Sequence, residues 1–365
     1  MTKLRVAILF GGPSSEHEIS CASAAGVLGA IDRSKYEVIP VGITKAGKWT
    51  LAADDADKWM LRKGQLASVE DEGNHVAFAT DGSRELILTD TTGSRSLGVV
   101  DVVFPVLHGP YGEDGSIQGF FEIADLPYVG SGVLASAVAM DKSFAKPIFA
   151  AHGLKVAECF IVTATQWSSD KAALQKKADA LGYPLFVKPA RGGSSRGTTK
   201  VKSADQFANA IAEAHRFDPK AMVESAVVGL EIECAVLEID GVAQASKVGQ
   251  IKIDSKFEFY DFEAKYLDGA TEIIIPADIP ASASDAIRAA SLDAFISLGC
   301  SGLARVDFFF TNTGEVVINE INTMPGFTAT SVFPKMWAAT GKSYEQIVQA
   351  LIDTAKRRTN GPLGN

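Results

Sequence analysis

The sequence is poor in cysteine and has no long apolar run. The four cysteines among its 365 residues, Cys21, Cys159, Cys234 and Cys300, lie far apart and form no CxxC pair. Such spacing is typical of reduced core residues in a cytosolic protein rather than of a disulfide framework. No stretch approaches the roughly 20 apolar residues of a membrane span, and the N-terminal apolar run, about five residues, is too short for a signal peptide. We therefore expect a soluble, cytoplasmic protein without a membrane partner.

The chain also has little basic charge. Its 35 Lys and Arg residues are outnumbered by 44 Asp and Glu residues, which leaves a formal net charge of −9, and no basic stretch is interleaved with aromatic residues. This balance argues against a nucleic-acid partner; the short KRR run at 356–358 is typical of a helix C-terminus. A hydrophobic fraction of 47% is ample for a core, and the length predicts two or three domains.

Two common nucleotide-binding motifs, GxGxxG and the Walker A sequence GxxxxGK[ST], are missing. Residues 4–12 (LRVAILFGG) predict a buried strand that ends in a glycine turn, and the helix after it is expected to begin with a capping box of Ser15 and Glu18. This order is typical of the mouth of a doubly wound sheet, although the missing GxGxxG disfavours a dehydrogenase. Glu16 lies in the first helical turn, where an acid can simply complement the helix dipole.

A predicted β-hairpin near the C-terminus carries the most informative acids. Within residues 305–322, the segments RVDFFF and EVVINEIN are rich in β-branched and aromatic residues and are separated by a polar turn. If the loop has an even number of residues, Asp307 lies opposite Glu320, with Cβ atoms about 4.5–5.5 Å apart. On the same register, Arg305 lies opposite Asn322. Paired carboxylates in apolar strands repel each other, whereas Asp, Glu and Asn oxygens suit Mg²⁺. The alternative is a solvated hairpin face that binds nothing.

A second cluster of motifs indicates a nucleotide site. In residues 185–201 (LFVKPARGGSSRGTTKV), Lys188 ends a predicted strand, and a glycine- and serine-rich loop leads into another strand. Such a loop can be merely flexible, but the strand lysine beside it favours phosphate binding by its amides and hydroxyls. Two further strands within residues 221–240 (AMVESAVVGLEIECAVLEID) flank a hinge, where an adenine ring can contact the backbone near Glu224 and Val227. A carboxylate just beyond the hinge can then accept hydrogen bonds from ribose hydroxyls.

The rest of the chain supplies a lid and supporting elements. Residues 255–273 (SKFEFYDFEAKYLDGATEI) are too polar for a core strand and too aromatic for a passive linker, so we predict a lid over an active site. His108 follows a predicted strand in a glycine-rich loop and is either structural or catalytic. Residues 52–96 show no usable periodicity. Helical spacing predicts helices at residues 143–154, 168–183, 282–299 and 343–358.

The motifs, taken in chain order, resemble those of the D-alanine–D-alanine ligases, members of the ATP-grasp superfamily: FGGPSSEHEIS, LHGPYGEDGS, MDK, LFVKPARGGSS, VES, EIE, YDFEAKY, ARVDFFF and INEINTMPGFTATS. The resemblance runs from the first strand to the last helix. It implies an α/β fold, α+β in the ATP-binding part, with a three-domain ATP-grasp architecture. An N-terminal doubly wound parallel-sheet domain is expected at 1–139, a central ATP-grasp lobe at 140–229 and a C-terminal lobe at 230–365, with ATP held between the last two.

The resemblance also implies a reaction. Members of this family join two D-alanines into D-alanyl-D-alanine through an acyl phosphate, release ADP and phosphate, and so supply a peptidoglycan precursor. The co-substrate is ATP, and the implied metals are two Mg²⁺ ions, for which Mn²⁺ can substitute. The family further implies a homodimer.

The family's functional residues match positions throughout this chain. Contacts to ATP are expected from Lys142, Lys188, Ser194, Glu224, Val227, Glu231 and, in the lid, Lys265. The implied magnesium ligands are Asp307, Glu320 and Asn322. The residues expected around the first D-alanine are Glu16, Ser194, Tyr266 and, as a neighbour, His108. Ser331 and Val332 are expected to bind the second D-alanine. Arg305 and the Gly326 amide are expected to stabilise the oxyanion of the second step.

Three positions depart from the family pattern without removing an expected ligand. Arg196 stands where GSSxG commonly has a small apolar residue, Ser225 stands where the hinge often has a long polar side chain, and Phe262 replaces a frequent lid tyrosine. A ligase that makes D-alanyl-D-lactate or D-alanyl-D-serine is an alternative, although the EAKY lid with Tyr266 favours D-alanine. A nucleotide-binding module without catalysis is disfavoured because the metal ligands and Arg305 are all present.

Overall fold

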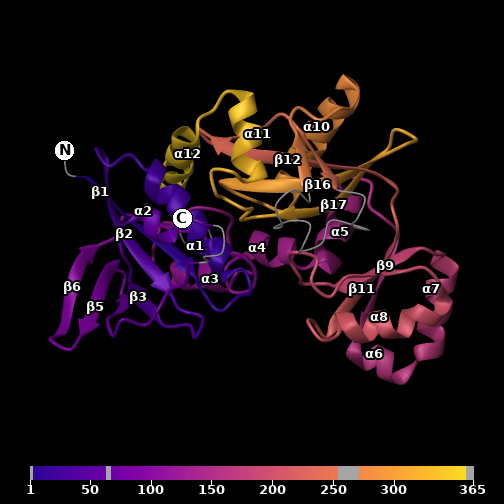
Figure 1. The fold of residues 1–365 in the computed structure, drawn as a ribbon, viewed down its shortest axis with the longest axis horizontal. Coiled ribbons are helices and arrows are strands. Elements are labelled where there is room, and N and C mark those ends of the chain that lie inside the picture. The colour runs from indigo at the N-terminus through magenta and orange to yellow at the C-terminus, as the bar shows by residue number, and fades with distance from the viewer. Residues whose placement is uncertain (1–2, 63–66, 254–270, 359–365) are drawn as a thin grey trace.

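The computed structural model describes residues 3–62, 67–253 and 271–358. The molecule is elongated, with the N-terminal strands at one end and an antiparallel sheet from the middle of the chain at the other (Figure 1). The C-terminal strands and helices lie between these two ends. Four sheets form within the described residues, and the predicted α/β class is confirmed. The lid residues Phe262, Lys265 and Tyr266 lie outside the described part of the chain.

The N-terminal sheet is mostly parallel and covered on both faces. Its elements are β1 (Leu4–Gly11), α1 (His17–Ala30), β2 (Tyr36–Ile43), β3 (Trp49–Leu51), α2 (Ala56–Trp59), β7 (Val102–Pro105) and α3 (Ser116–Ile123). In the order β3-β2-β1-β7, β1 runs parallel to β2 and β7, and β3 is an antiparallel edge. Val6, Ile8 and Phe10 pack on the α1 side, whereas Ala7 and Leu9 pack on the α3 side. The predicted doubly wound parallel sheet is therefore confirmed.

The carboxyl ends of β1 and β7 lie side by side because the two strands pair in parallel. The helices that follow them, α1 and α3, cover opposite faces of the sheet, so the chain changes direction there. Ligands of open α/β sheets bind at such a switch point. Gly11 makes the turn there with φ of 91°, and a Cβ on it would lie 2.3 Å from the Ile43 carbonyl oxygen. Only glycine fits this position. Glu16 and His108, which follow the two strands, are thus brought to the same edge.

The predicted capping box of Ser15 and Glu18 is wrong. Glu16 is the N-cap residue of α1, and no side-chain hydrogen bond caps this helix. The Glu16 amide instead donates to Ser14 Oγ (3.0 Å), and Glu18 forms an ion pair with Lys45 (2.5 Å) in the turn between β2 and β3. The helix therefore begins one residue later than the capping box predicts, and Glu18 contacts a distant lysine instead of the N-cap backbone.

Residues 52–96, which show no usable periodicity, contain a three-stranded antiparallel sheet. Its strands are β4 (His75–Phe78), β5 (Glu85–Asp90) and β6 (Gly93–Val99). Val76, Phe78, Leu86 and Leu88 alternate with more exposed residues and are buried in one cluster with residues of β1 and β2. This small sheet covers part of the N-terminal sheet, on the face that α3 also covers.

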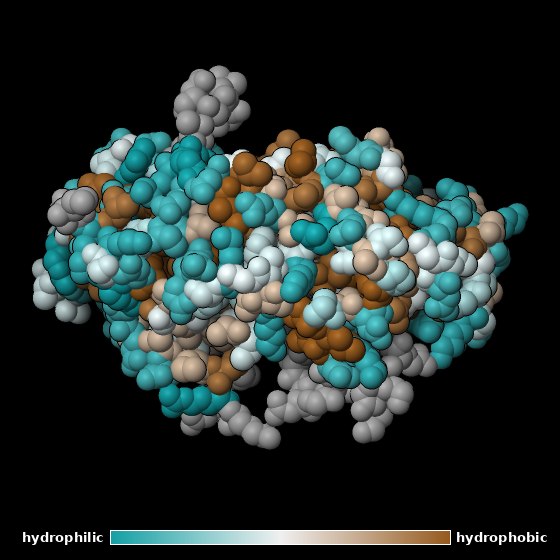
Figure 2. Space-filling model, turned by 90° about the horizontal axis from the view of Figure 1, so that it is seen from above, coloured by the Kyte–Doolittle hydropathy of each residue, from teal (hydrophilic) through white to brown (hydrophobic). Residues whose placement is uncertain are grey.

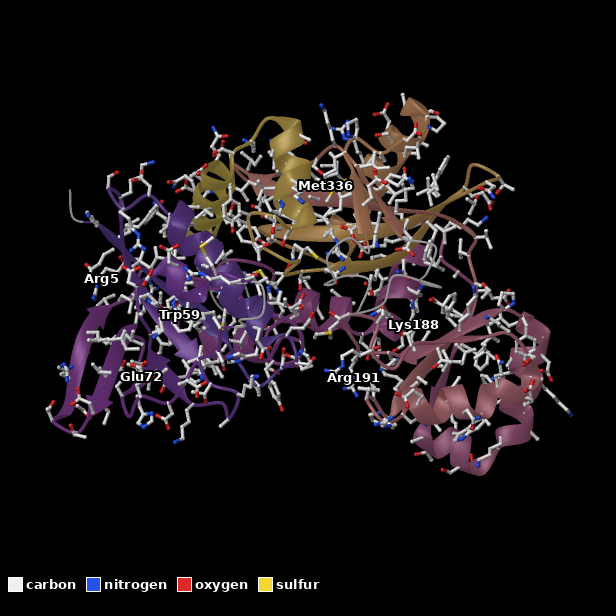
Figure 3. All side chains as sticks on the ribbon, in the orientation of Figure 1. Arg5, Trp59, Glu72, Lys188, Arg191 and Met336 are labelled. Atoms are coloured by element: carbon white, nitrogen blue, oxygen red, sulfur yellow. The ribbon has the colours of Figure 1, made fainter. Side chains whose placement is uncertain are left out.

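An antiparallel sheet forms the opposite end of the molecule (Figure 1). Its elements are β8 (Cys159–Thr163), α6 (Ala164–Ser169), α7 (Lys171–Leu181), β9 (Leu185–Pro189), β10 (Thr199–Val201), η1 (Ala204–Gln206), α8 (Phe207–Ala214) and β11 (Lys220–Ser225), with strand order β10-β9-β11-β8. Val187 and Val223 pack against the helices. The neighbouring residues in each strand, Lys188 and Glu224, therefore point to the other face. Figure 3 shows Lys188 and Arg191 on the side toward the rest of the molecule.

The C-terminal strands form a six-stranded antiparallel sheet that is packed on both faces. Its elements are α4 (Val133–Met140), α5 (Lys142–Ala151), β12 (Gly229–Ile239), β13 (Val242–Ala245), β14 (Gly249–Ile253), β15 (Thr271–Ile274), α10 (Ala281–Ser297), β16 (Leu303–Thr311), β17 (Val316–Asn322), α11 (Val332–Thr340) and α12 (Tyr344–Arg357). Ile232 and Val306 pack with α5 and α10, whereas Leu237 and Leu303 pack with α11, α12 and α1. The four helices predicted from spacing are confirmed as α5, α7, α10 and α12.

Seen from above, the surface is largely hydrophilic, and its hydrophobic side chains form separate groups (Figure 2). Within the ranges that the structure describes, no helix combines the length and the apolar character needed to cross a membrane. The most exposed large apolar side chains include Ile123 on α3 and Leu134 on α4, both 74% exposed.

Candidate active site

The β16–β17 hairpin places Asp307 opposite Glu320 and Arg305 opposite Asn322. The pairing is the predicted one, but the predicted reason for it is wrong. Residues 311–315 separate the outermost pair of the hairpin, and their number is odd. The register then shifts between Asp307 and Phe308, so that Asn319 becomes an extra residue in β17. This β-bulge restores the pairing of the two carboxylates.

Each hairpin carboxylate also has a cationic partner. Arg305 makes a bidentate contact with Asp307, both N–O distances being 2.7 Å, and lies 3.2 Å from Glu233. Lys142 Nζ lies 2.9 Å from Glu320 Oε2. These contacts balance the repulsion between the acids, since buried charges are stable only when paired. Lys142 is buried, which opposes its charge, but the charge of Glu320 outweighs this effect and raises the lysine pKa.

The oxygen atoms of the hairpin fit a hard divalent cation. Asn322 Nδ2 donates to Asp307 Oδ2 (3.1 Å), which leaves the Asn322 carbonyl oxygen on the same strand face as Glu320. Carboxylate and amide oxygens are the donors that Mg²⁺ prefers. Among the described residues, no group of three or more His, Cys, Asp or Glu side chains is arranged so that it could hold a metal ion by itself. A metal site here therefore depends on Asn322 and on oxygens that a bound phosphate supplies.

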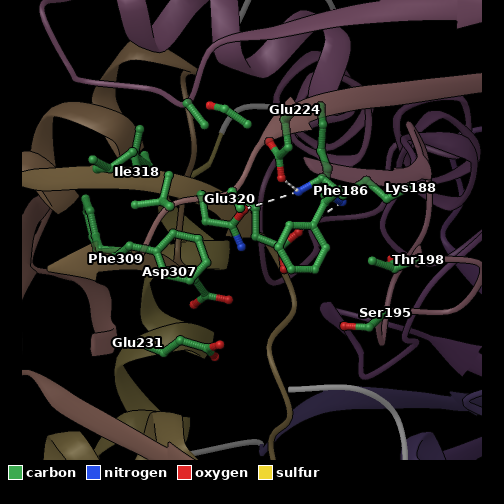
Figure 4. Close-up of a pocket in the computed structure, with 18 of the residues that line it drawn as sticks. Phe186, Lys188, Ser195, Thr198, Glu224, Glu231, Asp307, Phe309, Ile318 and Glu320 are labelled. Atoms are coloured by element: carbon green, nitrogen blue, oxygen red, sulfur yellow. Dashed lines mark hydrogen bonds and ion pairs between the residues drawn. The ribbon is translucent and has the colours of Figure 1, made fainter. Parts of the chain in front are cut away.

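A cavity of about 360 Å³ lies between the antiparallel sheet of β8–β11 and the hairpin. Glu224 and Lys188 point toward each other on one side of it, and Asp307 and Glu231 project from the other (Figure 4). Both the predicted ATP contacts and the predicted metal ligands are represented in its lining. The predicted residues that line it are Lys142, Lys188, Ser194, Glu224, Val227, Glu231, Asp307 and Glu320.

The cavity wall holds a buried charge cluster that sequence reasoning missed in part. Glu224 pairs with Lys188 and, at 2.9 Å, with Lys146. Burial alone would raise the pKa of Glu224, but the two lysines outweigh it and hold the pKa at about 2. Burial lowers the pKa of Lys188. Lys146 lies four residues after Lys142, so helical spacing could have placed both lysines on one face of α5.

Residues 190–198, between β9 and β10, are the glycine- and serine-rich loop that is predicted to bind phosphate, and we call them the phosphate loop. This loop is anchored at both ends. Arg191 donates from its backbone amide and its guanidinium to Asp218, with N–O distances of 2.8–3.0 Å. The guanidinium of Arg196, the residue that departs from the family pattern, lies 5.7 Å from the centre of the Phe217 ring. Between these anchors Ser194 adopts the left-handed conformation, with φ of 50°. Such a backbone exposes amides and hydroxyls toward the cavity.

One hydrogen bond joins the phosphate loop to the N-terminal sheet. Ser194 Oγ donates to Glu16 Oε1 at 2.5 Å, although 178 residues separate the two. The Glu16 carboxylate fits there because Gly109 has no side chain: a Cβ on Gly109 would lie 2.9 Å from Glu16 Oε2. Glu16 and Ser194, two of the residues expected around the first D-alanine, are therefore in direct contact. The third, Tyr266, lies outside the described residues, as does Lys265.

His108 is buried and uses both ring nitrogens. Nδ1 lies 3.0 Å from the Met324 carbonyl oxygen, which can only accept, so Nδ1 carries the proton. Nε2 then accepts from Ser23 Oγ at 2.8 Å. Burial lowers the pKa of His108, which keeps the ring neutral. His108 thus connects the loop after β7 with the loop after β17.

The loop after β17 carries the remaining predicted residues. Ser331 is the N-cap residue of α11, and Val332 begins this helix. Ser331 Oγ accepts from the Thr328 amide at 3.1 Å and would lie 3.2 Å from a Cβ on Gly326. Gly326, Ser331 and Val332 therefore lie close together beside the hairpin, although they do not line the cavity described above.

The architecture is that of the ATP-grasp enzymes, in which a phosphate loop and a carboxylate-bearing sheet enclose one nucleotide site. Family models described as D-ala D-ala ligase N-terminus and D-ala D-ala ligase C-terminus match residues 5–131 and 148–353. The chain belongs to the D-alanine–D-alanine ligase family.

Individual relatives agree with this assignment. The chain is 51% identical over 363 residues to the D-alanine–D-alanine ligase of Paenarthrobacter aurescens, which covers 98% of this chain and 96% of the relative. Among solved structures it is similar to the VanG D-Ala:D-Ser ligase of Enterococcus faecalis, with a TM-score of 0.85, 36% identity, and coverage of 97% of this chain and 100% of that one. The D-alanine–D-alanine ligase of Coxiella burnetii gives a TM-score of 0.81 and 34% identity, with coverage of 98% and 94%.

Proposed function

We propose that this protein is an ATP-dependent D-alanine–D-alanine ligase that makes D-alanyl-D-alanine for peptidoglycan synthesis. The observation that carries the proposal is the single cavity in which lysines, the phosphate loop and the hairpin carboxylates meet. The Ser194–Glu16 hydrogen bond adds a candidate D-alanine site to the end of that cavity. The chain aligns over nearly its whole length with a relative named D-alanine–D-alanine ligase, which supports the same reaction.

In the proposed first step, the carboxylate of one D-alanine attacks the γ-phosphate of ATP and forms an acyl phosphate, with ADP as the leaving group. Glu16 would hold the ammonium of this D-alanine, and Ser194 would orient Glu16. Lys142 and Lys188, with Lys265 of the lid, would offset the charge of the transferring phosphoryl group. Glu224, Val227 and Glu231 would hold the adenosine through the hinge and the ribose hydroxyls.

Asp307, Glu320 and Asn322 are the residues that would hold two Mg²⁺ ions, or Mn²⁺ in their place. These ions would supply charge neutralisation at the β- and γ-phosphate oxygens. The neighbouring Lys142 and Arg305 form ion pairs with Glu320 and Asp307 and hold the two hairpin acids in place.

In the proposed second step, the amine of a second D-alanine attacks the acyl carbon and displaces phosphate. Arg305 and the Gly326 amide would stabilise the tetrahedral oxyanion, and Ser331 with the Val332 amide would hold the second carboxylate. Loss of one such oxyanion donor typically costs about 10²–10³ in rate. Closure of the site would exclude water, which otherwise hydrolyses the acyl phosphate.

The direct test is an assay of phosphate release with ATP, Mg²⁺ and D-alanine, combined with identification of the product by mass spectrometry. We expect D-alanyl-D-alanine with D-alanine and no product with L-alanine. Phosphate release that does not depend on D-alanine would contradict the proposal.

The other candidate function is ligation of D-alanine to a different second substrate, because a D-Ala:D-Ser ligase is among the similar structures. Competition among D-alanine, D-serine and D-lactate as second substrate separates the two functions. Tyr266→Phe should weaken the rejection of D-lactate, since it removes a lid hydroxyl expected near the attacking amine. Unchanged use of D-lactate by this variant would count against that role.

We further propose a cytoplasmic homodimer with the three-domain division predicted at residues 140 and 230. Ile123 and Leu134, on the packed helices α3 and α4, are each 74% exposed, and a second copy of the chain is the partner we expect to cover them. Sedimentation of the wild type and of Leu134→Asp tests this: the variant should be monomeric.

A further inference from the structure

The loop that carries Gly326 is held from one side by the loop after β7. Both backbone groups of Met324 are used. The Met324 amide donates to Glu113 Oε1 at 3.1 Å, and its carbonyl oxygen accepts from His108 Nδ1 at 3.0 Å. More than two hundred residues separate Met324 from these partners, so only the fold brings them together.

Glu113 is itself fixed at its other oxygen. Oε2 accepts from the Gly109 amide at 2.7 Å, and the Glu113 amide donates back to the Gly109 carbonyl oxygen at 2.9 Å. The carboxylate is therefore a rigid link between two loops rather than a mobile side chain. Its charged neighbours are Glu16 and Arg305.

A second contact holds the same loop at Phe327, the residue after Gly326. Tyr344 on α12 donates its hydroxyl to the Phe327 carbonyl oxygen at 2.5 Å. Phe327 is fully buried, and its ring lies 5.3 Å from that of Tyr344 and 6.0 Å from that of Phe104. Gly26 of α1 makes room for this contact, since a Cβ there would lie 2.6 Å from the Tyr344 hydroxyl.

We propose that Glu113 and Tyr344 are positioning residues for the second half-reaction, because they hold the backbone on either side of Gly326 and so aim its amide at the developing oxyanion. The inference rests on the proposed function. Backbone donors stabilise an oxyanion only when they are fixed before charge develops, and a displacement of about 1 Å can reduce a rate by about 10²-fold. Neither residue touches a substrate or ATP in this scheme.

The test compares the variants Glu113→Gln and Tyr344→Phe with the wild type. Glutamine has almost the same shape as glutamate, but its amide group would turn an N–H donor toward the Met324 or Gly109 amide. Phenylalanine removes one hydroxyl. The matched control is Glu122→Gln on α3, which makes the same chemical change at a carboxylate that accepts from the Tyr128 hydroxyl at 2.7 Å and lies 3.6 Å from the Arg358 guanidinium.

The measurement is the ratio of phosphate released to dipeptide formed, with ATP, Mg²⁺ and D-alanine. Slower attack by the amine leaves the acyl phosphate exposed to water for longer, and hydrolysis then releases phosphate without dipeptide. We expect a ratio of one for the wild type and for Glu122→Gln, and a ratio of several for the two loop variants. Their dipeptide rate should fall about 10- to 100-fold, while the KM for ATP stays within about twofold.

A merely structural role gives a different result, since partial unfolding lowers phosphate and dipeptide together and keeps the ratio at one. A ratio of one in folded Glu113→Gln overturns the role of Glu113, and a ratio of one in Tyr344→Phe overturns the two-sided mechanism even if Glu113→Gln does not fold. A wild type that makes no dipeptide would instead contradict the proposed function.

Discussion

Asp307 faces Glu320 across the β16–β17 hairpin because Asn319 is an extra residue in β17. Without this bulge the odd-numbered loop would pair Asp307 with Asn319 and turn Glu320 to the other face. Asn319 also accepts a hydrogen bond from Lys188 Nζ at 3.3 Å. The residue that sets the hairpin register thus also links the hairpin to Lys188 of β9, and bulges are over-represented next to active sites.

Asp307→Asn and Glu320→Gln should each reduce ligation by at least about 100-fold while the fold remains intact, because each removes an ionised oxygen from the metal site. The assay is phosphate release at ordinary Mg²⁺ concentration, with circular dichroism to verify folding. Glu315→Gln, in the turn of the same hairpin, is the control, since the ion-pair partner of Glu315 is the exposed Lys155. A Glu320→Gln enzyme near the wild-type rate would contradict the metal assignment.

Ser194→Ala should raise the KM for the first D-alanine about 10- to 150-fold, because a hydrogen bond to a charged group contributes about 1.5–3 kcal/mol. The Glu16 carboxylate would lose its short contact with the phosphate loop. Steady-state kinetics with D-alanine varied at saturating ATP measure the effect. Ser168→Ala on α6 should leave the KM unchanged, and equal KM values for the two variants would refute this role of Ser194.

Lys146→Met should destabilise the protein, because breaking a buried ion pair typically costs about 3–5 kcal/mol. We expect a value at the lower end of this range, since Lys188 still pairs with Glu224. The folded-state pKa of Glu224, about 2, lies below its ordinary value of 4.5. This pairing therefore stabilises the protein above pH 4.5, and the contribution is lost as the pH falls toward 2.

Acid unfolding followed by circular dichroism should accordingly begin at a higher pH in Lys146→Met than in the wild type. The exposed Lys155→Met serves as the control, because surface ion pairs contribute little. Identical acid-unfolding curves for Lys146→Met and Lys155→Met would contradict the stabilising role of Lys146.

Stability should also fall as the pH rises from about 4.5 to about 8 because of Glu113. Burial and the negative charge of Glu16 raise the pKa of Glu113 from 4.5 to about 8, although Arg305 and two backbone amides oppose the rise; His108 on the same loop is neutral. A raised carboxyl pKa stabilises the folded state below pH 4.5, and this contribution is lost as the pH rises through about 8.

The melting temperature of the wild type relative to Glu113→Gln, which does not ionise, should therefore decline between pH 5 and 8 and level off above about pH 8. The slope is at most about 1.4 kcal/mol per pH unit. A difference in melting temperature that is constant over this range would show that Glu113 does not titrate there.

Much of the fold follows from local pattern. The apolar run of β1, the glycine turn after it, and the spacing of α7, α10 and α12 are each properties of adjacent residues, and the structure confirms them. The strands β4 to β6 were missed because they are short and half polar. Their apolar residues become a recognisable face only where they pack against β1 and β2.

The chemistry of the site was also partly local. Lys188 beside a glycine- and serine-rich loop, and two acids within one hairpin, were recognisable because strand alternation fixes which neighbours share a face. The sequence by itself therefore determined the fold class, the family and eight of the residues that line the cavity.

Only the tertiary structure decided how these parts meet. The bulge at Asn319 depends on pairing between whole strands, and the charge of Glu224 depends on Lys146 from another element. The contacts of Ser194 with Glu16 and of Glu113 with Met324 join loops that are 178 and 211 residues apart. No local pattern encodes such contacts, because they form only when separately folded layers pack and their buried polar groups must find partners.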